Sequence, residues 1–189
     1  MRNIRLSMEL KIQMSISNIT SERLYRQACD YFYFLENTKF ALLCIEKILN
    51  ITPKHRKSWF LKGEIFLLEN KIEEAIECFK KTEKYSAPLD NRARNLANIA
   101  VCYEMLEDYK KALLFCSKAL DCICEEDYDF LPSLYQLQIS SLIKLGHYSK
   151  AKRALKDFNS YLFSEDIHCL KMNLTNSIKE KVVQLKIAK

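Results

Sequence analysis

The chain has 189 residues, of which 30 are basic and 24 acidic, which gives a formal net charge of +6. This length suits one folded domain, since about 100 to 200 residues usually form one. Two glycines and three prolines are too few for the many tight turns of a β-rich protein, so the composition favours long helices. The charges are dispersed along the chain, which indicates a weak preference for acidic partners and gives no indication of nucleic-acid binding.

The first twenty residues alternate between apolar and mainly polar side chains from Ile4 to Ile16. This alternation has the period of a half-buried strand and not of a helix. Three conformations stay open for this N-terminal arm, residues 1–20. It is disordered, it is packed as a helix against the rest of the chain, or it pairs with a strand of a partner. We find neither the apolar stretch of a signal peptide nor a segment that could span a membrane, so we expect a cytoplasmic protein without membrane insertion.

One short sequence pattern occurs four times in the chain, around Ala41, Ala75, Ala112 and Ala151, at steps of 34, 37 and 39 residues. Repetition at this period is typical of stacked helix pairs. The best copy follows the spacing W-x2-L-G-x2-Y and then A-x3-F, with Trp59, Lys62, Gly63, Phe66, Ala75 and Phe79 in these positions. The sequence therefore resembles the tetratricopeptide repeat (TPR) family.

The resemblance implies an all-α fold in which antiparallel helix pairs stack into a right-handed superhelical solenoid. Within residues 21–163 we place four TPR-like helix pairs, at about 22–55, 56–89, 93–126 and 132–163. Residues 164–189 carry apolar side chains at steps of three and four after a helix-start signal at Ser164, and we expect them to form a C-terminal capping helix.

Small residues are expected where the two helices of a pair cross, because they let the backbones approach. The first helices supply Cys29, Gly63 and Ala100, which we expect to lie opposite the repeated alanine of the second helices. The fourth pair has Ile139 in this position. Its two helices are therefore either splayed or packed in a different register.

The sequence contains no constellation that indicates catalysis or metal binding. The eight cysteines lie mostly at apolar positions of the helical pattern, without a C-x-x-C pair or a His/Cys cluster. We expect free thiols in a reducing compartment, with no metal and no cofactor. The three histidines are scattered, and neither a phosphate-binding loop nor a nucleophile motif is present, so we expect no enzyme.

In TPR proteins the first helix of each pair lines a concave groove, and the resemblance implies the ligand-facing positions here. Arg23, Lys57 and Arg94 occupy the same position in three successive pairs. Because guanidinium groups bind carboxylates in a bidentate manner, we expect an acidic protein or peptide partner. The expected groove positions are Arg23, Arg26, Asp30, Lys57, Phe60, Glu64, Arg94, Asn98, Val101 and Gln136.

These features predict a non-catalytic protein-protein interaction module, an adaptor or assembly scaffold that binds a partner segment. Residues 17–160 also resemble the class II chaperones of bacterial type III secretion, which are small TPR proteins with an N-terminal arm that hold translocator segments. A third interpretation is a carboxylate clamp of the co-chaperone type. Asn98 matches the clamp asparagine, but Phe60 and Glu64 stand where that clamp has a lysine and an asparagine.

Overall fold

The computed structural model describes residues 2–86, 92–123, 130–161, 175–176 and 179–180. All regular elements among these residues are helices, as the sequence predicts. The chain divides into two compact units, Met1–Pro88 and Leu89–Lys189, and each unit is described by itself.

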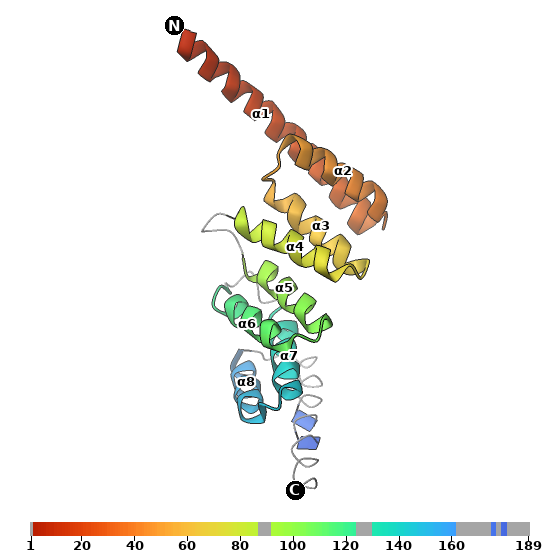
Figure 1. Cartoon of the computed structure of the whole chain (residues 1–189), viewed down its shortest axis with the longest axis vertical. Coiled ribbons are helices and arrows are strands. Elements are labelled where there is room, and N and C mark those ends of the chain that lie inside the picture. The colour runs from red at the N-terminus through yellow and green to blue at the C-terminus, as the bar shows by residue number, and fades with distance from the viewer. Residues whose placement is uncertain (1, 87–91, 124–129, 162–174, 177–178, 181–189) are drawn as a thin grey trace. The chain divides into compact units, whose positions relative to one another are not determined.

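The first unit contains two helix pairs (Figure 1). Helix α1 (Arg2–Cys29) continues into the π-helical turn η1 (Asp30–Phe34) and packs against α2 (Thr38–Ile51). Helix α3 (Arg56–Leu68) packs in the same way against α4 (Ile72–Lys84). The buried side chains of α1, α2 and α3 form one cluster, so the two pairs share a core.

The second unit repeats this arrangement with two further pairs. Helix α5 (Ala93–Met105) packs against α6 (Tyr109–Leu120), and α7 (Leu131–Lys144) packs against α8 (Tyr148–Tyr161). Helix α6 also packs against α7. The apolar cluster between α5, α6 and α7 therefore joins the two pairs into one core.

The N-terminal arm has the helical conformation, one of the three that its sequence leaves open, and not the strand whose period its side chains follow. Residues 2–20 are helical and continue without interruption into the part of α1 that packs against α2. A helix satisfies its backbone hydrogen bonds within itself, whereas a single strand would leave its N–H and C=O groups without a neighbouring strand. The expected capping helix, residues 164–189, lies outside the described residues except for 175–176 and 179–180, which are helical.

The turn inside each helix pair uses one residue in the left-handed backbone region. These residues are Glu36, Asn70, Glu107 and Gly146, with φ of 49°, 59°, 57° and 76°. They follow one another at the same steps of 34, 37 and 39 residues as the repeated alanines. The sequence repeat is thus also a repeat of backbone conformation, although only one of the four turns has glycine, which adopts this conformation without steric strain.

We expect opposite effects from exchanging the residue types of two of these turns. Gly146→Ala should destabilise the protein by about 1 kcal/mol, because a Cβ disfavours positive φ. Glu107→Gly should raise the free energy of unfolding by up to about 1 kcal/mol, since it relieves the same strain. Thermal melts of both variants check this, and a shift of the same sign in both would contradict the common turn geometry.

The crossing of α3 and α4 depends on Gly63. Its closest neighbour on α4 is Phe79 and not Ala75, the alanine expected from the sequence. A Cβ placed on Gly63 would lie 2.6 Å from Cε1 of Phe79, a fully buried ring one turn beyond Ala75. The ring of Phe79 therefore fills the space that the missing side chain leaves.

In the fourth pair, Ile139 is fully buried against Ala151 and Ala154, so that α8 supplies the small residues at this crossing.

Gly63→Ala should therefore destabilise the first unit even though alanine is the better helix former. Overpacking costs about 1 to 3 kcal/mol, more than the roughly 1 kcal/mol that alanine gains over glycine in a helix. We expect a lower melting temperature for Gly63→Ala and a smaller effect of the same substitution in a Phe79→Leu background. Equal effects in both backgrounds would show that the ring does not limit this position.

Candidate functional site

Three of the six cysteines that the structure describes are buried in the core, where their sulfur atoms pack as small apolar groups. Cys78, Cys102 and Cys116 are buried free thiols, and burial raises their pKa to about 11, 12 and 12. Cys122 is exposed, and Cys124 and Cys169 lie outside the described residues. In the described part of the chain, no three His, Cys, Asp or Glu side chains are placed to hold a metal ion. Every helix among the described residues is too short or too polar to cross a membrane.

Ionisable side chains of α1 and the start of α3 meet at Glu22 in the first unit. Lys57 Nζ lies 3.3 Å and His55 Nε2 lies 3.6 Å from Oε1 of Glu22. Lys57 Nζ also lies 5.7 Å from the centre of the Tyr25 ring. Lys57 is thus in an ion pair, and the negative charge of Glu22 reduces the attraction that Lys57 would exert on an anionic ligand.

His55 caps the N-terminus of α3 through a ring nitrogen that must be unprotonated. Its Nδ1 accepts a hydrogen bond from the Ser58 backbone N–H at 3.3 Å and lies 2.8 Å from Ser58 Oγ. Burial lowers the pKa of His55, although the carboxylate of Glu22 acts in the opposite direction. The neutral ring is therefore the form that the folded state favours.

This cap should make stability depend on pH. Because the pKa of His55 is lower in the folded state than in the unfolded chain, its contribution is complete above the unfolded pKa of about 6.5 and decreases as the pH falls through the folded value. His55→Asn keeps a capping acceptor but does not titrate. Melting temperatures measured between pH 7.5 and pH 5 should fall more for the wild type than for this variant, and parallel curves would contradict the role of His55.

Two cations of α1 remain exposed on the same face of the helix. Arg23 and Arg26 make no hydrogen bond or ion pair with any residue that the structure describes. Together with Asn18, Ile19 and Glu22 they line a shallow hollow of about 440 Å³. Ile19 is 71% exposed. The first unit therefore offers unpaired guanidinium groups beside an apolar side chain.

The other expected site residues of the first unit are partly engaged in packing. The Phe60 ring is half-buried and lies 5.8 Å from the Phe79 ring, centre to centre. Glu64 Oε2 accepts a hydrogen bond from Tyr33 Oη at 2.8 Å, so this carboxylate ties α3 to η1. Asp30 is exposed at the first residue of η1. Of these three residues, only Asp30 has an exposed polar side chain.

The expected site residues of the second unit lie on α5 and α7. The Arg94 guanidinium lies 4.7 Å from the centre of the Phe130 ring, and Val101 packs against the apolar core. Asn98 is half-buried on α5, and Gln136 is exposed on α7. Arg23 and Lys57 belong to the first unit and Arg94 to the second, so their expected convergence stays a prediction.

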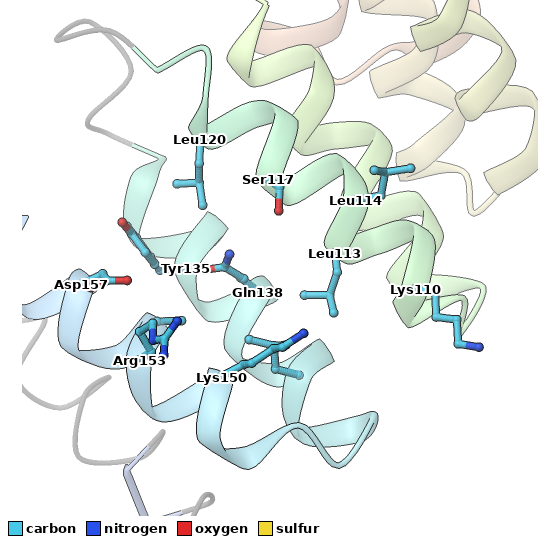
Figure 2. A pocket seen from close by; sticks show the side chains of 12 residues that line it. Lys110, Leu113, Leu114, Ser117, Leu120, Tyr135, Gln138, Lys150, Arg153 and Asp157 are labelled. Atoms are coloured by element: carbon cyan, nitrogen blue, oxygen red, sulfur yellow. The ribbon is translucent and has the colours of Figure 1, made fainter.

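A larger hollow lies on the second unit, at positions that the sequence analysis did not select. It has a volume of about 490 Å³ and is lined by α6, α7 and α8 (Figure 2). The lining residues of α6 and α8 recur at steps of three and four, which is the spacing of one helix face. In the sequence this spacing is that of the solvent-exposed residues that flank the buried face of any amphipathic helix. Only the packing of three helices brings these residues together around a hollow.

Comparisons with known proteins place the chain in a family and identify its fold. A family model described as "Domain of unknown function (DUF6340)" matches residues 62–161. No curated protein matches the sequence. The apo form of RapI is similar over 90% of this chain and 53% of its own, with a TM-score of 0.74 and 19% sequence identity.

Two further solved structures resemble the chain. YrrB, "a TPR protein with an unusual peptide-binding site", is similar over 70% of this chain and 64% of its own, with a TM-score of 0.60 and 15% identity. MamA is similar over 75% of this chain and 81% of its own, with a TM-score of 0.59 and 13% identity. The predicted TPR-like fold is thereby confirmed. The chain spans about half the length of RapI and less than two thirds of YrrB.

Proposed function

We propose that this chain, which belongs to the family described as a domain of unknown function (DUF6340), is a non-catalytic protein-binding module, an adaptor or assembly scaffold. Its TPR-like fold stacks helix pairs, and stacked repeats present extended surfaces that bind other proteins. YrrB, a protein of the same fold, has a peptide-binding site, which supports this class of function.

The observation that carries the proposal is the pair of unpaired cations on α1. Arg23 and Arg26 lie beside Ile19 on one helix face, and neither makes an ion pair or hydrogen bond with a described residue. Guanidinium groups bind carboxylates with two parallel hydrogen bonds, and an exposed isoleucine loses contact with water when an apolar side chain covers it. The partner segment that fits this surface is an acidic peptide with at least one apolar side chain.

The contacts in the first unit support this general interpretation over a carboxylate clamp. The clamp positions hold Phe60, which packs on Phe79, and Glu64, whose carboxylate already accepts the Tyr33 hydroxyl. A secretion chaperone that holds translocator segments stays an alternative. Binding of such an apolar segment would depend little on salt, whereas binding through Arg23 and Arg26 would weaken as salt screens the charges.

Affinity capture from the native cell, followed by mass spectrometry, tests the proposal. The wild type should recover a partner that the Arg23→Ala/Arg26→Ala variant recovers at least several-fold less, because both carboxylate-binding groups are gone. Lys39→Ala/Lys47→Ala on α2 removes the same charge from exposed positions that do not line the hollow, and is the matched control. Both variants should melt like the wild type, since solvated surface changes usually stay within about 0.5 kcal/mol.

Equal recovery of the partner by the wild type and both variants would remove the α1 surface as the binding site. Recovery that is unchanged by raising the salt concentration would favour the apolar-segment alternative.

A further inference from the structure

The hollow on the second unit has an apolar floor. Helix α7 packs against both α6 and α8, and the lining residues come from all three helices. Tyr135, Leu142 and Ala154 are buried at its base, and Leu113 is half-buried. Leu114 is 52% exposed at its edge. The volume of about 490 Å³ lies in the range of about 300 to 1,000 Å³ that is usual for ligand pockets.

The rim of the hollow is positively charged. Lys110 on α6 and Lys150 and Arg153 on α8 are exposed, and none of them makes a hydrogen bond or ion pair with a residue that the structure describes. Asp157 is the single acidic residue among the lining side chains, so the lining carries three cations and one carboxylate. Such a rim attracts anionic groups over about 8 to 10 Å at moderate salt.

Uncharged polar groups complete the lining. Gln138 of α7 and Ser117 of α6 are among the lining residues (Figure 2). An amide side chain can both donate to a carbonyl oxygen and accept from an N–H, which are the two groups of a peptide backbone. The lining therefore combines apolar, amide and cationic side chains.

We propose that this hollow is a second docking site, which binds a segment of a partner protein in which one aliphatic or aromatic side chain is flanked by carboxylates. The apolar side chain contacts Leu113, Leu114 and Leu142, and the carboxylates pair with Lys150 and Arg153. The site goes beyond the proposed function of the α1 surface, because it lies on another unit and is lined by α6, α7 and α8.

The lining favours a peptide over nucleic acid. Single-stranded nucleic acids bind through bases that stack on exposed aromatic rings. The one aromatic residue of the lining, Tyr135, is buried at 6% exposure and offers no free ring face. A leucine-lined floor instead fits an apolar side chain, and the surplus of positive charge selects acidic neighbours for it.

Selection from a displayed library of random 12-residue peptides on the full chain tests the proposal. Enriched sequences should carry Leu, Ile, Met or Phe beside Asp or Glu. Their affinity, measured by fluorescence anisotropy, should fall roughly tenfold for Lys150→Glu/Arg153→Glu, since two attractive ion pairs become repulsive. Lys152→Glu/Lys156→Glu makes the same change in charge on exposed α8 residues outside the lining and should bind like the wild type.

Two further variants keep the outcome unambiguous. Leu114→Ser removes an apolar contact at an exposed position and should weaken binding several-fold without a change in net charge. Arg23→Ala/Arg26→Ala should bind the selected peptides like the wild type. If it does not, the peptides bind to the α1 surface and the second site is overturned while the proposed function stands.

Three results would overturn the proposal directly. The first is equal loss of affinity in both charge-reversal variants, which indicates non-specific attraction. The second is the absence of any peptide enriched on the wild type relative to Lys150→Glu/Arg153→Glu. The third is displacement of every selected peptide by an oligothymidylate probe that binds more tightly, which would assign the hollow to nucleic acid.

Discussion

The whole structure depends on the close approach of two helix backbones in each pair. Ala41, Ala75, Ala112 and Ala151 are all fully buried, one in the second helix of every pair. Any larger side chain there would push the helices apart and open the packing beneath it. At the second pair the missing side chain of Gly63 leaves the space that the Phe79 ring occupies.

This constraint also determines which side chains face outward and are available for binding. One face of each helix packs at the crossing. The remaining face of α1 carries Arg23 and Arg26, and α6, α7 and α8 surround the hollow. The two surfaces that we propose for binding thus lie on separate units. The turns between the helices support the arrangement by repeating one backbone conformation, even where glutamate occupies the left-handed position.

Neighbouring residues give equivalent positions of the repeat different roles. Lys57 pairs with Glu22 and lies near the Tyr25 ring, whereas Arg94 stacks over Phe130. Arg23, at the same position of the repeat, has no such partner among the described residues. Repetition in a sequence therefore identifies equivalent positions but not equivalent charges, because the field at each position is the sum over its own neighbours.

The sequence by itself determined the helix pairs, since periodic apolar residues and small residues at fixed spacing express local geometry and the crossing of adjacent helices. For residues 2–20 it left three conformations open, namely disorder, a packed helix and a strand paired with a partner, and the structure has the helix, which supplies its own backbone hydrogen bonds. It indicated Arg23 and Arg26 but not which cations are paired. Only the tertiary structure decided that Lys57 meets Glu22 and that α6, α7 and α8 enclose a hollow, because these contacts join residues far apart in the chain whose distances no local pattern records.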